Sequence, residues 1–262
     1  MCIKFTPRIL LIFFAGLAFS ILTSGKPARA LTAEVTPRNV PINILYHGAQ
    51  LTITGKSDAN DDLIVRISSE AEEAHMKYKG KAAGIFWMKL GDISFENVPT
   101  VYMLETSKAL DALLPVEERV KEGLGFEAIK AGAKMESSAP AMDADQWIDE
   151  FIKLKKAEKL YQVKEGTISR GQGANGNEYR LEVHWPYQAT PGTYDIEVLA
   201  VRDGNVVDRT ETQLTVAREG VVAKLSNLAF NHAAIYGIVA ILVAMAAGFA
   251  VGALFKKGGG AH

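Results

Sequence analysis

Residues 233–255 contain no charged side chain, and this run constrains the chain more than any other feature. A stretch of this length can cross about 30 Å of hydrocarbon as a single helix. The alternative is a buried core helix, but core helices rarely lack every charge over such a length. Lys256 and Lys257 follow directly, and basic residues at the end of a span stay in the cytoplasm. We therefore predict one transmembrane helix, with residues 256–262 as a cytoplasmic tail.

The first thirty residues have the pattern of a secretion signal. Lys4 and Arg8 precede an apolar run at residues 9–23, and Ala28-Arg29-Ala30 supplies a small-x-small cleavage pattern. The run is short for a full crossing, which needs about 20 residues. We predict a signal peptide at residues 1–30, with an uncleaved signal anchor as the alternative. Both interpretations place the main domain in the periplasm, and with the signal peptide removed the protein crosses the bacterial inner membrane once.

The exported part is acidic and free of cysteine. Cys2 lies inside the predicted signal, so disulfides, thiolate metal sites and a cysteine nucleophile are excluded from the mature chain. Without residues 1–30 and the two tail lysines, 23 basic residues stand against 30 acidic ones, a net charge near −7. Such a domain repels phosphate backbones, which argues against a nucleic-acid partner.

Two groups of short alternating strands predict a mainly β domain over residues 31–220. Strand patterns run from residue 31 to about 106 and return at 178–185, 192–201 and 206–216. Between them, at about residues 107–160, apolar residues recur at helical spacing, with Asp143 as an N-cap for the clearest helix. We predict an immunoglobulin-like β-sandwich interrupted by this helical insertion, with two separate domains as the alternative.

The predicted membrane helix carries a stripe of small residues, and the segment before it has helical spacing. The stripe residues recur every four positions and therefore share one face: Ala240, Ala244, Gly248 and Gly252. Small residues let two helices approach closely, so this face is predicted to pair with a second copy or with a partner membrane protein. The alternative is the general abundance of Ala and Gly in membrane helices. Residues 221–232 could extend the helix or lie along the membrane surface.

No pattern predicts catalysis, a cofactor or a metal site. None of the five histidines lies two to four residues from another, so no zinc pattern exists. Residues 58–62 resemble the opening of a calcium loop but lack its glycine and its closing glutamate. The glycines of residues 171–176 match a dinucleotide-binding pattern in letters only, because a strand pattern and not a helix follows. We expect neither enzymatic activity nor a cofactor.

The densest aromatic and apolar stretch, residues 84–102, has two interpretations. It could belong to the core of the sandwich, or it could form a surface that docks a partner in or near the membrane. For the second interpretation the candidate residues are Phe86, Trp87, Phe95 and Tyr102.

Several short motifs are shared with a known family. They are Val40-Pro41-Ile42, Gly48-Ala49-Gln50-Leu51, Ala83-Gly84-Ile85-Phe86-Trp87-Met88, Phe95-x-x-Val98-Pro99-x-x-Tyr102, Trp185-Pro186 and Pro191-Gly192-Thr193-Tyr194. In these motifs the chain resembles a bacterial family of transmembrane proteins of unknown function, described mainly from alphaproteobacteria. The resemblance implies no catalytic residues. The association of that family with sulfite-exporter-type permeases implies an accessory role beside a transporter.

Together these observations favour a non-enzymatic accessory or scaffold protein for a membrane partner such as a transporter. A periplasmic ligand-binding or sensor module, with the helical insertion as a lid, is the alternative. An enzyme would need a site assembled from residues that are distant in the sequence.

Overall fold

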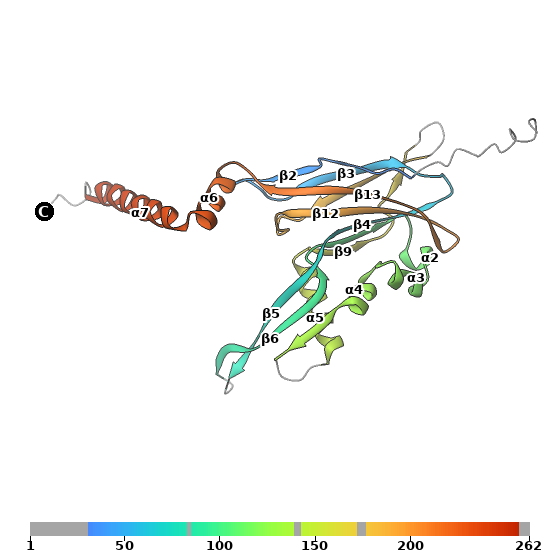
Figure 1. The fold of residues 1–262 in the computed structure, drawn as a ribbon, viewed down its shortest axis with the longest axis horizontal. Helices are drawn as coiled ribbons and strands as arrows, with labels where there is room; N and C mark the ends of the chain where they lie inside the picture. Colours follow the sequence, from blue (N-terminus) through green and yellow to red (C-terminus); the bar gives the residue numbers. More distant parts are fainter. Residues whose placement is uncertain (1–30, 83–84, 139–142, 172–176, 257–262) are drawn as a thin grey trace, which may run out of the picture. The chain divides into compact units, whose positions relative to one another are not determined.

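The computed structural model describes residues 31–82, 85–138, 143–171 and 177–256. The predicted signal peptide, the tail from residue 257 onward and residues 172–176 of the glycine-rich loop lie outside the described residues. The described chain is mainly β, with a helical insertion and one apolar helix toward its C-terminal end (Figure 1). The predicted fold class is confirmed at this level.

The first sheet has four strands in the order β1-β3-β11-β10, and all its neighbours are antiparallel. Its strands are β1 (Glu34–Thr36), β3 (Ala49–Lys56), β10 (Ser169–Arg170) and β11 (Glu178–Trp185). β3 and β11 pair along their whole lengths, from Lys56 opposite Glu178 to Ala49 opposite Trp185. Burial alternates residue by residue along β11, because successive side chains of a strand point to opposite faces.

The second sheet has six strands in the order β2-β13-β12-β4-β7-β9. Its strands are β2 (Asn39–Ile42), β4 (Asp62–Ser69), β7 (Tyr102–Thr106), β9 (Tyr161–Lys164), β12 (Gly192–Arg202) and β13 (Asn205–Arg218). The pairs β2–β13 and β7–β9 are parallel, and the others are antiparallel. The central strand β12 is buried almost continuously from Tyr194 to Val201, which indicates that both of its faces are covered.

The two sheets pack around a shared core. The indole ring of Trp185 on β11 meets the ring of Tyr194 on β12 edge to face, with centroids 4.6 Å apart. Tyr194, Ile196 and Val198 are all buried, and their spacing puts them on the face of β12 that meets the first sheet. In both sheets a strand from before the insertion pairs with a strand from after it, so the sandwich is one unit that the insertion interrupts.

A long hairpin leaves the sandwich where shorter strands were predicted. β5 (Ala71–Ala82) and β6 (Phe86–Pro99) form this hairpin, and β8 (Lys134–Ser137) adds to β6. The prediction of several short strands here was wrong, because two irregularities in the β5–β6 register interrupt the alternation without ending the strands.

The described part of the insertion forms four helices, of which α5 packs against this hairpin. They are α2 (Leu110–Leu113), α3 (Val116–Lys121), α4 (Phe126–Gly132) and α5 (Ala144–Ala157). α5 follows Asp143, the predicted N-cap, although the Asp143 side chain makes no capping hydrogen bond. The ring of Phe151 lies 4.7 Å from that of Phe95, and the indole of Trp147 lies 5.3 Å from the ring of Tyr78. α5 therefore buries one face of the hairpin (Figure 1).

Two helices follow the last strand. α6 (Gly220–Asn231) covers the segment that was expected to be helical, and α7 (Ala233–Lys256) follows it. Residues Ala233–Phe255 have a mean hydropathy of 2.6, and none of them is buried in the described chain. By length and composition this helix can cross a membrane.

Candidate functional site

The structure divides the predicted docking surface into two parts. Phe86 and Trp87 lie at the end of the β5–β6 hairpin and are each 70% exposed, whereas Phe95 is 0% and Tyr102 2% exposed. Phe95 lies under α5, and Tyr102 lies on β7 inside the second sheet. The docking hypothesis is therefore restricted to Phe86 and Trp87, and the two buried residues belong to the core.

The extent of α5 decides where the hairpin becomes exposed. Tyr78 is the last residue of β5 with a ring contact to α5, through Trp147. Beyond it the strands continue as a two-stranded ribbon, with Gly80 opposite Met88 and Lys81 opposite Trp87. No sequence pattern marks this point, because the covering helix comes later in the chain.

Lysines occupy the face of this ribbon that points away from α5. Lys79 pairs with Lys89 across the strands, and Lys81 pairs with Trp87, so these four side chains share one face. The Lys81 ammonium lies 5.8 Å from the centroid of the Trp87 ring, within range of a cation–π contact. Lys89 also forms a 2.5 Å ion pair with Asp92.

The small-residue stripe lies entirely on α7. Ala240, Ala244, Gly248 and Gly252 are exposed, and a Cβ atom added to either glycine would meet no described atom within 4 Å. This face is therefore not used in packing within the described chain. The pairing role of the stripe stays a prediction.

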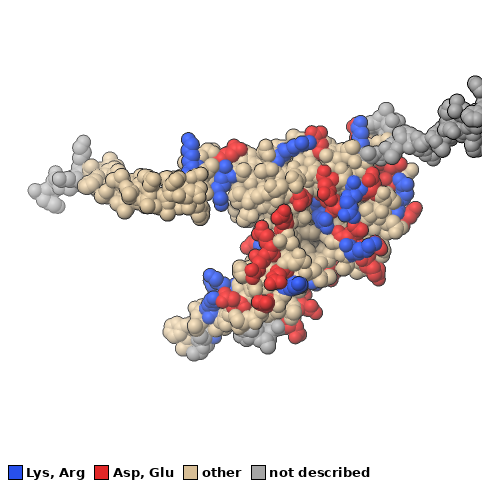
Figure 2. Space-filling view, viewed as in Figure 1, with Lys and Arg blue, Asp and Glu red and all other residues tan. Residues whose placement is uncertain are grey.

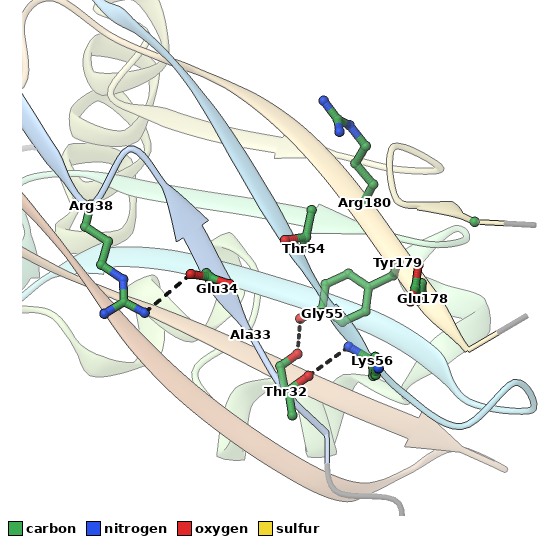
Figure 3. Close-up of a pocket in the computed structure, with 11 residues that line it drawn as sticks. Thr32, Ala33, Glu34, Arg38, Thr54, Gly55, Lys56, Glu178, Tyr179 and Arg180 are labelled. Carbon is green, nitrogen blue, oxygen red and sulfur yellow. Dashed lines mark hydrogen bonds and ion pairs between the residues drawn. The ribbon is translucent and has the colours of Figure 1, made fainter. Parts of the chain in front are cut away.

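A cavity of ≈ 640 Å³ lies beside β1, β3 and β11 (Figure 3). Its wall is fixed by Thr32, whose carbonyl accepts a hydrogen bond from the Tyr179 hydroxyl at 2.7 Å and whose side chain accepts one from the Lys56 amide at 2.9 Å. A Cβ at Gly55 would lie 1.8 Å from the Thr32 carbonyl oxygen, so only glycine allows this close approach.

Both arginines beside the cavity are paired with carboxylates. Arg38 lies 3.8 Å from Glu34 (Figure 3). Arg180 lies 3.0 Å from Glu182. Tyr179 is buried, and this burial raises the pKa of its hydroxyl above the usual value. The cavity is therefore open to the surface, and its two arginines, Arg38 and Arg180, already have carboxylate partners.

A charge cluster between the second sheet and the insertion was not predicted from the sequence. Glu197 on β12 is buried, and it forms ion pairs with Arg66 at 2.5 Å and with Arg209 at 2.9 Å. Arg66 also donates to the carbonyls of Glu122 and Gly123, which follow α3. Because an unpaired buried carboxylate is costly, these contacts hold the insertion against the sheet.

Tyr102 completes this junction. Its hydroxyl donates to the Gly123 carbonyl at 3.1 Å and accepts from the Gly125 amide at 2.7 Å. Burial raises the pKa of Tyr102 to about 12, so the hydroxyl keeps its proton at neutral pH and remains a donor. The residue has a structural role at the start of α4.

Glu105 is a second buried carboxylate. It lies on β7 opposite Val65, where Thr167 donates a 2.7 Å hydrogen bond and the Lys164 ammonium lies 3.5 Å away. Burial raises the pKa of Glu105, and the contacts with Thr167 and Lys164 offset part of this effect. In the described parts of the chain, no group of three or more His, Cys, Asp or Glu side chains has the arrangement of a metal site.

Comparison with protein families identifies the chain at the level of its family. The model of the family described as "Putative transmembrane protein (Alph_Pro_TM)" matches residues 30–257. The chain belongs to this family. Within the family match lie the sandwich, the insertion and α7, so a transmembrane assignment agrees with the apolar helix and fits a single-pass membrane protein. A search of the curated proteins found no match.

The raised pKa of Glu105 leads to a prediction about how the stability of the fold depends on pH. Because its folded-state pKa is raised, the folded protein holds a proton that the unfolded chain has lost between the ordinary and the raised pKa. Its contribution to stability is therefore present at low pH and lost as pH rises through the raised pKa. The stability of Glu105→Gln relative to wild type should therefore increase as the pH rises above the ordinary range of a glutamate pKa, because the glutamine has no proton to lose.

This difference is measured by denaturant unfolding of the full chain in detergent. Glu136→Gln, at an exposed glutamate on β8, is the matched control and should show no such growth. An advantage of Glu105→Gln that stays constant over this range would contradict the raised pKa.

Proposed function

We propose that this family member is a non-enzymatic accessory or scaffold protein that binds a membrane partner, such as a transporter, through α7. The observation that carries the proposal is the unused small-residue face of the helix, where Gly248 and Gly252 border open space. In a bilayer, close backbone packing at such residues stabilises helix pairs without a hydrophobic driving force. The resemblance to alphaproteobacterial proteins associated with sulfite-exporter-type permeases supports a transporter as the partner. The alternative partner for the same face is α7 of a second copy of the chain.

The proposal includes an orientation in the bacterial inner membrane. Lys256 and Lys257 favour a cytoplasmic tail, and the secretion-signal pattern of residues 1–30 agrees with this direction. The sandwich would then be periplasmic. Its strand orders, β1-β3-β11-β10 and β13-β12-β4, match the ABED and GFC orders of immunoglobulin domains and support the immunoglobulin-like assignment.

The orientation is tested by cysteine labelling in a Cys2→Ser background. A membrane-impermeant maleimide applied to cells with a permeabilised outer membrane should label Tyr187→Cys, at an exposed loop position of the sandwich. Lys257→Cys should be labelled only after the inner membrane is lysed. The reverse pattern would place the sandwich in the cytoplasm and contradict the proposal.

The pairing face is tested by the double change Gly248→Leu and Gly252→Leu. Two leucines separate the helix backbones, and recovery of the crosslinked partner or second copy should fall by roughly tenfold, which corresponds to about 1.4 kcal/mol. The measurement is co-purification of the full chain after crosslinking in membranes. Ala250→Leu, on the opposite side of α7, is the matched control and should leave recovery unchanged. Equal recovery from all variants, or no captured partner, would contradict the accessory role.

A ligand-binding or sensor module is the second candidate, and the ≈ 640 Å³ cavity beside β1 is the observation that favours it. Its volume falls in the range of small-molecule sites, and Arg38, Lys56 and Arg180 would suit an anion. No residue of the helical insertion lines this cavity, so the insertion gains no support as its lid. A thermal-shift screen with anions and small molecules should show stabilisation that Arg38→Ala removes, and a flat response would eliminate this candidate.

A further inference from the structure

The hairpin end exposes more apolar surface than any other described part of the sandwich and insertion. Its apolar residues are Ile85, Phe86, Trp87, Met88 and Leu90, with exposures of 72%, 70%, 70%, 51% and 37%. Soluble proteins expose large apolar side chains singly, and a contiguous group marks a contact surface. We call these five residues the hairpin tip.

Four lysines of β5 and β6 lie beside the hairpin tip. The lysines are Lys77, Lys79, Lys81 and Lys89, and Asp92 is the one acid among the described residues from 77 to 92. The acids of this hairpin lie toward its other end, at Glu70, Glu72 and Glu73 before and at the start of β5. Figure 2 shows blue side chains gathered beside the tan end of the region that β5 and β6 occupy in Figure 1. The hairpin is therefore polarised, with an acidic base and a basic, apolar end.

This order of groups matches the depth profile of a lipid surface. Indole rings favour the boundary between headgroups and acyl chains, and apolar side chains favour the layer below it. Lysine side chains can extend their ammonium groups upward to lipid phosphates while their stems stay in the apolar layer. Lys77, Lys79 and Lys81 occupy alternate positions of β5 and would extend toward the anionic headgroups.

The composition favours a lipid surface over a protein partner. Lysine is depleted at the centre of protein–protein interfaces, where a desolvated ammonium needs a dedicated acidic partner. At a membrane the same ammonium groups stay hydrated and gain energy from every anionic lipid nearby. The chain also has a candidate membrane span of its own, which would tether the domain to a bilayer.

We propose that the hairpin tip inserts into the interfacial layer of an anionic lipid bilayer and gives the protein a second membrane contact besides α7. This proposal rests on membrane anchoring by α7 and not on the accessory role. The tip would dock the β5–β6 hairpin, and through Tyr78, Trp147 and Phe95 the packed α5 helix, against the lipid surface.

Trp87 provides a reporter within the natural chain. The protein has three tryptophans, and Trp147 and Trp185 are buried in the core. The full chain is reconstituted into vesicles of brominated phosphatidylcholine, with or without phosphatidylglycerol. In the anionic vesicles, bromine should quench the Trp87 emission and aqueous iodide should not. Subtracting the spectrum of Trp87→Phe isolates this contribution.

Two triple lysine-to-glutamate variants, one beside the hairpin tip and one elsewhere, test the role of the lysines. Lys77→Glu, Lys79→Glu and Lys81→Glu together should reduce the inserted population by at least 100-fold, since each lysine near an anionic surface contributes about fivefold. Bromine quenching of Trp87 should then be lost. The control is reversal of three exposed lysines elsewhere, Lys121, Lys134 and Lys153, which makes the same change in net charge and should leave the quenching intact.

Three outcomes would overturn the proposal. The first is iodide access to Trp87 in both lipid compositions without bromine quenching. The second is quenching of equal size in neutral and anionic vesicles. The third is protection of Trp87 only after a protein partner is added, which would make the tip a protein-docking surface. Trp87 quenching in a wild-type chain that captures no partner would support this proposal while the accessory role fails, and capture of a partner without Trp87 quenching would do the reverse.

Discussion

Pairing between strands from opposite sides of the insertion is the interaction on which the rest of the structure depends. β3 pairs with β11 and β4 pairs with β12, so neither sheet is complete until the chain has returned from the insertion. The entropy lost in closing such a connection rises only slowly with its length, which allows a long hairpin and four helices to be accommodated. The core around Trp185 and Tyr194 then forms between two finished sheets.

The insertion becomes part of the domain through charge as well as packing. Glu197 points away from the sandwich core, and on an exposed sheet it would face water. Here the insertion covers that face, so the carboxylate is stable only because Arg66 and Arg209 neutralise it. Arg66 in turn binds the backbone after α3, and Tyr102 binds the same turn. One polar junction thus fixes both the sheet and the start of the helical segment.

Features that depend on a local pattern could be predicted from the sequence. The burial of a side chain by a segment far away in the sequence could not. β11 was predicted with its observed bounds, because its alternation is uninterrupted, and the α7 span was predicted because nothing in it is charged. Phe86 and Phe95 lie on one strand and cannot be distinguished by type, yet α5 covers only Phe95. The burial of Glu105 and Glu197 was missed for the same reason, since a glutamate in a strand ordinarily indicates a solvent-facing position.

The connection between the sandwich and α7 has a mechanical consequence. The chain enters α6 directly from β13, which is bonded to β12 along its length and to β2 from Thr215 to Arg218. A further hydrogen bond joins the Glu219 amide to the Ile42 carbonyl where the strand ends. A pull transmitted from the lipid-embedded helix would therefore be shared among many backbone hydrogen bonds on both edges of β13. The pairing of β2 with the end of β13 thus adds hydrogen bonds at the point where such a load would enter the sandwich.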